Sequence, residues 1–241
     1  MDDIQKRYEK EINELVQASV WLGEIGYVSS HGGNLSYRVE EDVVLITPTK
    51  VPKRKLTFDD MVIINFDGKI LFSGNGRSPT GETPIHLNIF RKRPDIKGLV
   101  HAHPPVLTGF SLLDDEMLSR PLLPEPIIEL GPVTYVNYEE PLSQRLAAAF
   151  DSTVDRSNAF IMKNHGVMIC SPEGVSRAVE LLEMLENMAY SVFVAASMGK
   201  VNEISMDEVD KLERTIKTRN LPMPGKPGSV KRLRDAYRQK I

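Results

Sequence analysis

The chain has 241 residues, of which 41% are hydrophobic and 26% are charged, as is typical of a soluble globular protein. With 30 Lys and Arg against 33 Asp and Glu, the net charge of −3 argues against a protein that coats nucleic acid, so we expect no nucleic-acid partner. The single cysteine, Cys170, excludes a disulfide framework and a cysteine-rich zinc module. Neither a signal peptide nor an apolar run of membrane-spanning length is visible, so we expect a cytoplasmic protein with no membrane partner.

The N-terminal half begins with a helical pattern and continues with short alternating segments. Apolar residues three and four positions apart indicate a helix, whereas strict alternation indicates a strand. Thr83-Pro84 is typical of a helix start, with Thr83 as the cap and the proline at the first helical position. In chain order, these patterns predict a helix over 3–25, strands over 35–39, 43–46, 62–65 and 70–72, a helix over 83–92 and a strand over 98–102.

The C-terminal half interleaves helices and strands around a proline-rich segment at 121–132, which we expect to be irregular at its start. Prolines and glycines after residue 221 indicate a break, so we divide the chain into a domain over 1–220 and a C-terminal tail or short helix over 221–241. Short turns between several strands favour a mixed α/β sheet covered by helices. In chain order, we predict a helix over 106–113, a strand over 133–136, a helix over 142–150, strands over 160–162 and 167–170, and helices over 171–197 and 206–219.

Three of the five histidines are placed where they can share a metal ion. His101 and His103 stand two positions apart at the end of an apolar run, and the period of two of a strand puts both imidazoles on one face. His165 lies between two further apolar runs, where a turn or strand end can supply a third ligand. Catalytic zinc takes three protein ligands and one open position. A histidine pair of this kind also occurs in ordinary packed strands, so the pair alone indicates a metal only weakly.

Glu82 stands at the start of a predicted helix, about twenty residues before the histidine pair. A carboxylate there can act as a general base or a displaceable ligand, although capping the first helical turn is the commoner use of Glu at such a position. His86 follows four residues later on the same helix face, and we interpret it as packing or as support for Glu82 rather than as a metal ligand.

These segments together resemble the class II aldolase/adducin head family. The matching strings lie, in the family's order, at 33–36, 46–49, 78–86, 100–104 and 163–167, and the resemblance covers roughly residues 8–198. It implies an α/β fold, a three-layer α/β/α sandwich with a mainly antiparallel central sheet. It also implies a homotetramer with the active sites at the subunit interfaces.

The family resemblance implies a role for each matching residue. His101, His103 and His165 would bind one divalent metal ion per chain, most commonly Zn²⁺, with Mn²⁺, Co²⁺ or Fe²⁺ as alternatives because imidazole accepts all of them. Glu82 would act as the catalytic acid and base at the metal. The residues that would bind the small-molecule substrate, through its phosphate or carboxylate group, are Asn34, Thr49, Lys50, Thr80 and Gly81.

The chain also departs from the family pattern. Lys50 stands where family aldolases usually have glycine, and Thr80-Gly81 stands where they have two serines, so one hydroxyl is lost and a cation is gained. The tyrosine that aldolases place after the histidine pair is not evident. Glu125 is a candidate replacement as proton donor, and Tyr237 is another if it reaches a neighbouring subunit's site.

The resemblance therefore implies a metal-dependent carbon–carbon lyase of carbohydrate metabolism. The leading expectation is an aldolase that cleaves a sugar phosphate, similar to L-fuculose 1-phosphate, to dihydroxyacetone phosphate and an aldehyde through an enediolate whose charge the metal stabilises. The alternative is a metal-dependent decarboxylase of a hydroxy acid. A sugar-phosphate epimerase, whose family members usually have Asp in place of Glu82, and a non-catalytic adducin-like scaffold are less favoured.

Overall fold

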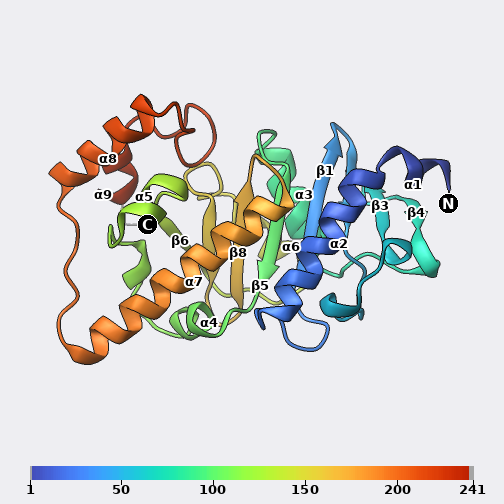
Figure 1. Ribbon diagram of the computed structural model, residues 1–241, viewed down its shortest axis with the longest axis horizontal. Helices are drawn as coiled ribbons and strands as arrows, with labels where there is room; N and C mark the ends of the chain where they lie inside the picture. Colours follow the sequence, from blue (N-terminus) through green and yellow to red (C-terminus); the bar gives the residue numbers. More distant parts are fainter. Residues whose placement is uncertain (1, 239–241) are drawn as a thin grey trace.

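A computed structural model describes residues 2–238. Within these residues the strands form one eight-stranded sheet in the order β4-β3-β2-β1-β5-β8-β7-β6 (Figure 1). Neighbouring strands pair antiparallel except β6 and β7, which are parallel. The strands are β1 (Asn34–Glu40), β2 (Val43–Ile46), β3 (Val62–Asn65), β4 (Ile70–Ser73), β5 (Gly98–Ala102), β6 (Val133–Val136), β7 (Ala159–Met162) and β8 (Gly166–Ser171).

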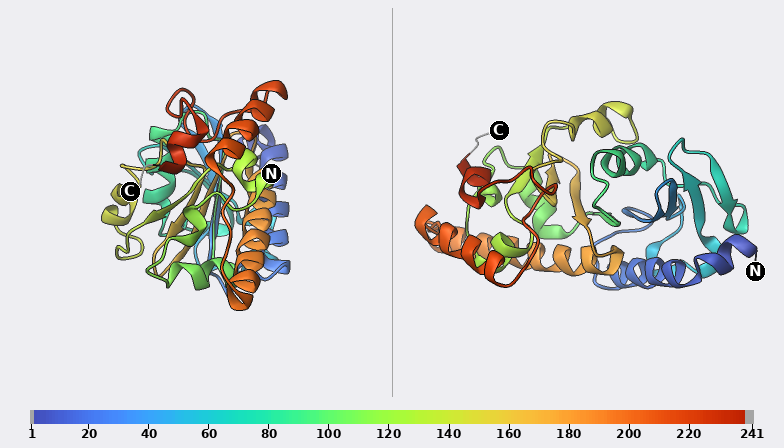
Figure 2. Two further views of the ribbon diagram at one scale, coloured as in Figure 1. Left: turned by 90° about the vertical axis from the view of Figure 1, so that its left-hand side faces the viewer. Right: turned by 90° about the horizontal axis from the view of Figure 1, so that it is seen from above.

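Helices cover both faces of this sheet, which confirms the predicted three-layer α/β/α architecture. Figure 2 shows α2 and α7 end to end along one face, with α3 and α6 on the other. The helices are α1 (Asp3–Arg7), α2 (Glu9–Glu24), α3 (Thr83–Lys92), α4 (Pro105–Ser111), α5 (Pro124–Glu129), α6 (Gln144–Ala149), α7 (Val175–Met198), α8 (Met206–Thr218) and α9 (Leu233–Arg238).

Each face of the sheet has its own hydrophobic core. Residues of α2 and α7 pack with Val100 of β5 and Val167 of β8, whereas residues of α3 and α6 pack with Leu99 and Met168 of the same two strands. Successive side chains of one strand thus point to opposite cores, as strand geometry requires. The central strands β5 and β8 are therefore buried on both faces, and polar groups at their ends lie in partly desolvated surroundings.

Three local predictions differ from the structure. The predicted helix over 3–25 is divided at Tyr8, which ends α1 and begins α2. The proline-rich segment is irregular at 121–123, as predicted, but then forms the short helix α5, because a proline at its first position has a φ that suits a helix start. The cap of α3 is Glu82 rather than Thr83, which is the first helical residue.

The chain's last described segment folds back onto the domain. Ile127 of α5, Val209 and Ile216 of α8, and Leu233 of α9 form a third apolar cluster at the end of the sheet opposite α1 (Figure 1). Glu213 of α8 accepts a hydrogen bond from the backbone N–H of Leu233 at 2.8 Å. Part of the segment predicted as a tail or short helix is thus the helix α9, and the division at residue 220 stays a prediction. Among the described residues, we find no helix whose length and apolarity would let it cross a membrane.

Strand register brings distant polar residues to one edge of the sheet. Asn34 of β1 pairs with His101 of β5, and Ala102 of β5 pairs with Val167 of β8. Residues that pair directly share a face of the sheet, so Asn34 and His101 both point toward the face that α3 covers. The end of β5, the start of β1 and the start of β8 therefore meet beneath the first turn of α3.

Candidate active site

The structure brings His101, His103 and His165 together at this edge. His101 is the penultimate residue of β5, His103 follows the strand, and His165 lies in the turn between β7 and β8. The Nε2 atoms of His101 and His103 are 3.0 Å apart, and the His101 and His165 ring centres are 4.8 Å apart. One nitrogen from each ring lies within 4.8 Å of the others. Three nitrogens bound to one zinc ion lie roughly 3.3 Å apart, given Zn–N bonds of about 2.0–2.1 Å, so small rotations would let these rings share an ion.

The backbone of the neighbouring strand fixes which nitrogen of His101 faces the other two histidines. His101 Nδ1 lies 2.9 Å from the carbonyl oxygen of Val167 on the paired strand β8. A carbonyl only accepts, so Nδ1 carries the proton and Nε2 presents its lone pair toward the other imidazoles. Protein metal sites commonly hold a ligating histidine in this way. The sheet therefore prepares His101 as a metal ligand.

The glycine after His165 is required by the close approach of His103. A Cβ atom at Gly166 would lie 2.4 Å from Cδ2 of His103 and 2.6 Å from the Ala102 carbonyl oxygen, which no real side chain tolerates. Asn164, before His165, has a φ of +56°, and asparagine is one of the few residues that adopt this left-handed conformation readily. The Asn164-His165-Gly166 sequence thus makes a tight turn that places an imidazole against His103.

Glu82 lies directly beside the histidines instead of capping its own helix. Its side chain makes no cap hydrogen bond to α3. Oε2 lies 3.3 Å from His101 Nε2 and accepts a hydrogen bond of 2.7 Å from the amide Nδ2 of Asn34, while Oε1 lies 3.5 Å from His165 Nε2. Burial alone would raise the pKa of Glu82, but His101, the Asn34 hydrogen bond and His165 outweigh it and lower that pKa to about 2. The carboxylate is therefore ionised next to three imidazoles.

Two buried polar atoms at this place have no hydrogen-bond partner among the described residues, Glu82 Oε1 and His165 Nδ1. Buried polar groups are almost always paired, so orphans at one place indicate a ligand. Burial, together with His101, lowers the pKa of His103 to about 3 and that of His165 to about 4. Neutral imidazoles with available lone pairs are what a divalent ion requires. The donor set thus fits a metal ion on the chemistry of its own residues.

These pKa values predict that the metal-free protein loses stability in mild acid. His86, His103 and His165 have folded-state pKa values of about 3, 3 and 4 against an ordinary 6.5, so between pH 6.5 and 4 the unfolded chain binds more protons. The free energy of unfolding should therefore fall as the pH falls from 7 to 5, by at least about 2 kcal/mol given 1.36 kcal/mol per pKa unit. Urea denaturation of chelator-treated protein at both pH values measures this, and a free energy unchanged within error would contradict it.

Of the three segments predicted to bind the substrate's anionic group, those at 47–50 and 78–81 lie side by side, whereas the Asn34 side chain is bonded to Glu82 and His86. Thr49 donates its N–H to the Ser78 carbonyl at 3.0 Å, and Thr80 donates its N–H to the Thr47 carbonyl at 3.1 Å. Lys50 is exposed and has a φ of +60°, a conformation that glycine adopts without strain and that accounts for glycine at this position in family aldolases. Gly81 leaves room for Leu142, whose Cδ2 would lie 2.9 Å from a Cβ there.

The two proton-donor candidates lie elsewhere in the chain. Glu125 is exposed in the first turn of α5, and Tyr237 packs on the cluster formed by α5, α8 and α9. Within one chain, therefore, neither is among the groups that contact the three imidazoles. Sequence reasoning also missed Lys53, which is only 2% exposed, donates to the Val51 carbonyl at 3.2 Å, and has its pKa lowered by burial to about 8. Lys53 stands among exposed basic residues in the sequence, so no sequence pattern indicated that it is buried.

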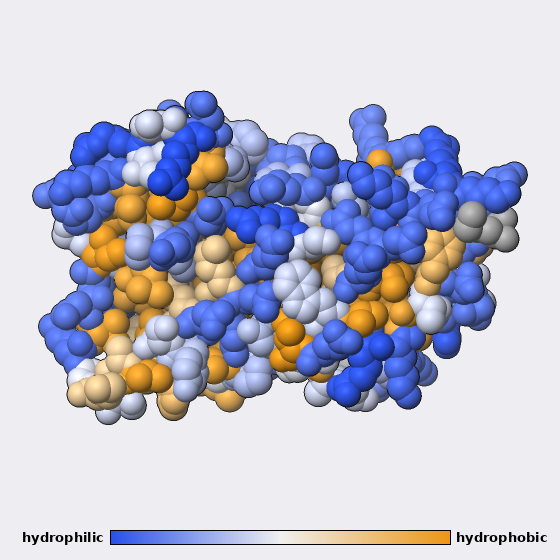
Figure 3. Space-filling view, viewed as in Figure 1, coloured by the Kyte–Doolittle hydropathy of each residue, from blue (hydrophilic) through white to orange (hydrophobic). Residues whose placement is uncertain are grey.

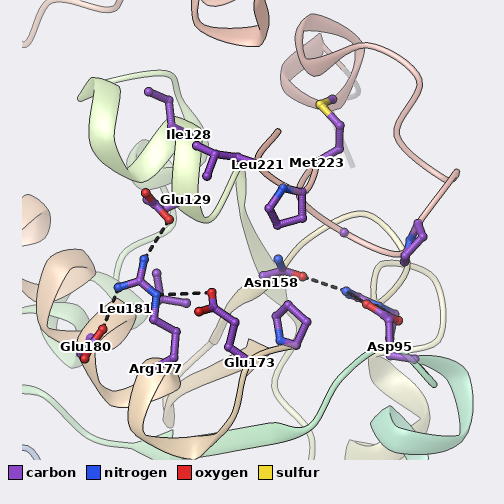
Figure 4. A pocket seen from close by; sticks show the side chains of 15 residues that line it. Asp95, Ile128, Glu129, Asn158, Glu173, Arg177, Glu180, Leu181, Leu221 and Met223 are labelled. Atoms are coloured by element: carbon purple, nitrogen blue, oxygen red, sulfur yellow. Dashed lines mark hydrogen bonds and ion pairs between the residues drawn. The ribbon is translucent and has the colours of Figure 1, made fainter. Parts of the chain in front are cut away.

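A separate cavity of about 400 Å³ lies at the opposite edge of the sheet, where β8 ends (Figure 4). Arg177 of α7 forms ion pairs there with Glu129 at 2.8 Å and Glu180 at 2.7 Å. Arg93 donates to Asn158 at 2.9 Å. Both arginines of this cavity are thus paired with neighbouring side chains, in contrast with the orphaned oxygen of Glu82.

The chain matches one known family over most of its length. The family model described as Class II Aldolase and Adducin N-terminal domain matches residues 13–192. The chain belongs to this family. The predicted resemblance is therefore confirmed.

Curated relatives in the family act on phosphorylated compounds, by their names. The chain is 29% identical over 202 residues to a 3-oxo-tetronate 4-phosphate decarboxylase of Haemophilus influenzae, which covers 83% of this chain and 94% of the relative. It is 31% identical to a 5-deoxy-D-ribulose 1-phosphate aldolase of Bacillus thuringiensis, covering 86% and 95% of the two chains. Among solved structures, YgbL of Klebsiella pneumoniae superposes with a TM-score of 0.78 at 28% identity, covering 85% of this chain and 98% of that one. The family thus includes both decarboxylases and aldolases.

Proposed function

We propose that the protein is a metal-dependent carbon–carbon lyase that decarboxylates a phosphorylated 3-oxo acid. The observation that supports this most directly is the convergence of three imidazoles on Glu82, whose buried Oε1 has no partner in the described chain. The curated decarboxylase relative aligns over 83% of the chain. Sequence analysis placed aldol cleavage first and decarboxylation second, and the relatives favour the reverse order.

In this proposal, His101, His103 and His165 hold one divalent ion, most commonly Zn²⁺. A divalent ion at this place supplies positive charge that stabilises the negative charge developing on the substrate's carbonyl oxygen. Manganese, cobalt and iron(II) are alternatives because neutral imidazole binds them all.

Glu82 carries out the proton transfer in this proposal. When the carbon–carbon bond to the carboxylate breaks, carbon dioxide leaves and the adjacent carbon must gain one proton. Glu82 Oε1 is buried beside His165 and is free of other hydrogen bonds in the described chain. Glu82, which is ionised before the reaction, would take up from solvent the one proton that decarboxylation consumes and pass it through Oε1 to that carbon. Asn34 keeps the second oxygen of Glu82 in place through its 2.7 Å hydrogen bond. One carboxylate suffices for this reaction because only one proton is transferred to carbon.

The remaining predicted contacts orient the substrate in this proposal. Thr49, Lys50 and Thr80 would bind its phosphate, and the backbone at Gly81 would lie beside it. Lys50 offers a point charge on an exposed, flexible stem. The adjacency of the segments at 47–50 and 78–81, linked by the Pro48–Pro79 bridge, supports this assignment.

Aldol cleavage of a sugar phosphate is the second candidate. An L-fuculose phosphate aldolase of Methanocaldococcus jannaschii is 36% identical over 164 residues, which favours this reaction at the same site. Aldol cleavage needs a further group to exchange a proton with the substrate hydroxyl. Glu125 or Tyr237 of another subunit would have to supply it. Within one chain, neither contacts the histidine triad, which is His101, His103 and His165.

A substrate panel with two separate readouts distinguishes the two reactions. We expect the metal-loaded protein to release carbon dioxide from 3-oxo-tetronate 4-phosphates in a metal-dependent manner. Aldehyde release from L-fuculose 1-phosphate or 5-deoxy-D-ribulose 1-phosphate, without carbon dioxide from the oxo acids, would replace the decarboxylase by the aldolase. Turnover of neither class, in protein carrying a full metal complement, would refute both.

The proposed assembly is a homotetramer in the cytoplasm. The C-terminal half of α7 exposes a row of large apolar side chains, which Figure 3 shows as an apolar region over that helix, and such a row is typical of a protein interface. Its members are Tyr190, Phe193, Val194 and Met198. The buried free thiol of Cys170 supports a reducing compartment. Sedimentation equilibrium would measure the oligomeric state, and a monomer at micromolar concentration would contradict the tetramer.

A further inference from the structure

A buried series of hydrogen bonds connects the sheet to Glu82 through His86. The hydroxyl of Ser36, on β1, lies 2.6 Å from Nδ1 of His86, on α3. The other ring nitrogen, Nε2, bonds to Oδ1 of Asn34, and Nδ2 of Asn34 bonds to Glu82 Oε2 at 2.7 Å. Ser36 and His86 are fully buried, and Asn34 and Glu82 are 4% and 5% exposed. Water therefore has little access to the series, and each group depends on its neighbour.

The donors and acceptors in this series can be assigned in only one direction. An ionised carboxylate only accepts, so Asn34 must turn its N–H toward Glu82 and its oxygen toward His86. His86 must then donate from Nε2. Burial lowers the pKa of His86 to about 3, so the ring is neutral and its Nδ1 is a bare acceptor. The Ser36 hydroxyl is left as the donor to Nδ1.

We propose that Ser36 and His86 are positioning residues that set the orientation of the Asn34 amide and, through it, hold Glu82 with Oε2 fixed and Oε1 free for proton exchange. This inference rests on the proposed function in assigning proton transfer to Glu82. Neither residue reaches the triad itself: Ser36 faces α3 from the middle of β1, and His86 lies one helical turn after Glu82.

The two oxygens of Glu82 differ in their surroundings as this proposal requires. Oε2 has the Asn34 N–H at 2.7 Å and His101 Nε2 at 3.3 Å. Oε1 is buried, has no hydrogen-bond partner among the described residues, and faces His165. A carboxylate that lost the Asn34 bond could rotate and exchange the two oxygens. The series therefore distinguishes two oxygens that are chemically equivalent.

Removing the Ser36 hydroxyl would weaken the positioning of Asn34 and Glu82 while leaving the histidine triad intact. Without that hydroxyl, the buried Nδ1 of His86 is an acceptor that has lost its donor, so the ring keeps only one of the two hydrogen bonds that fix it. The Nε2–H···Oδ1 bond is then held less firmly, and with it the Asn34 amide that fixes Glu82 Oε2. Removal of one partner from a buried hydrogen bond costs more than the bond itself contributes, because the other partner stays unsatisfied.

Kinetics of Ser36→Ala test this step. We expect kcat to fall by roughly a factor of ten, with KM and metal content unchanged, in line with loss of one buried hydrogen bond of about 1.5 kcal/mol. Ser19→Ala is the matched control, because Ser19 is also fully buried and its hydroxyl bonds only to the Leu15 carbonyl within α2. Equal kcat values in Ser36→Ala and the parent would overturn the proposal.

Two substitutions of His86 separate positioning from packing. His86→Gln keeps a side-chain N–H that can donate to Asn34, so we expect its kcat to stay within about tenfold of the parent. His86→Phe fills a similar volume without any donor, and we expect a loss of about a hundredfold or more. A glutamine variant no better than a folded phenylalanine variant would overturn the proposal. If the phenylalanine variant does not fold, the Ser36→Ala comparison decides the matter.

The tautomer of His86 gives a readout independent of activity. Nitrogen-15 NMR of the metal-loaded parent at neutral pH should show His86 protonated on Nε2 and bare on Nδ1, and in Ser36→Ala the Nδ1 resonance should shift because that atom loses its hydrogen bond. A parent protonated on Nδ1 would refute the assigned direction of the series. A parent with the expected tautomer but no turnover of any substrate would refute the proposed function and leave the hydrogen-bond assignment standing.

Discussion

Replacement of Glu82 with glutamine should lower kcat by about a thousandfold while leaving the metal content unchanged. General acid–base groups contribute roughly 10² to 10⁴ to the rate, and glutamine cannot exchange a proton at neutral pH. The shape is preserved, and Asn34 can still donate to the amide oxygen in place of Glu82 Oε2. Steady-state kinetics, with metal content measured by mass spectrometry on the same preparations, would test this on whichever substrate the panel identifies.

The matched control is Glu208→Gln, in which an exposed glutamate paired only with Lys211 on α8 loses its charge. That variant should keep the parent kcat. A Glu82→Gln enzyme within tenfold of the parent, with its metal in place, would remove Glu82 from proton transfer. The same result would also remove the reason for the Ser36–His86–Asn34 series to affect kcat.

His103→Ala should abolish metal retention and, with it, activity. The parent should contain about one divalent ion per chain, and the variant should lose at least about a hundredfold in affinity, since even partners outside the metal's own ligands contribute tenfold to a hundredfold. The chain should stay folded, because His103 is only partly buried and follows the end of β5. Metal analysis after dialysis, together with circular dichroism, measures both properties.

An exposed histidine outside the triad provides the control for this experiment. His31 is exposed and contacts Ser30, so His31→Ala should keep its metal. Added zinc should raise the melting temperature of the parent and of His31→Ala, but not of His103→Ala, because only a folded site binds the ion. Stoichiometric metal in His103→Ala would show that the triad is not the binding site.

The sheet was predictable because its strands have a simple signal. Each predicted strand overlaps an observed one, since β-branched and apolar residues bounded by turn residues mark short buried strands well. The division of the first helix at Tyr8 was not predictable, because the apolar spacing continues through that residue. Helix α5 was missed because the closely spaced prolines of this segment were interpreted as breakers, although Pro124 is at a position where a helix accepts one.

The site was predictable only for residues that stand in a distinctive local sequence. His101, His103, His165 and Glu82 stand in short strings that resemble a family, and the structure places them together. Ser36 also stands in such a string, at 33–36, but its contact with His86 was not predictable, because a polar residue in an alternating strand is the pattern of a solvent-facing position and His86 is 50 residues away. Lys53 was obscured in the same way by the exposed basic residues beside it.

The pairing of β5 with β8 has a consequence for how the protein is made. His101 bonds to Val167, 66 positions later in the chain, and His165 immediately precedes β8. A growing polypeptide that has emerged only through His103 holds two of the three imidazoles and has no partner strand β8 to orient His101. The ability to capture an ion therefore arises late in synthesis, once a long loop has closed and β5 has paired with β8. Ion capture would then report that this long-range pairing is complete.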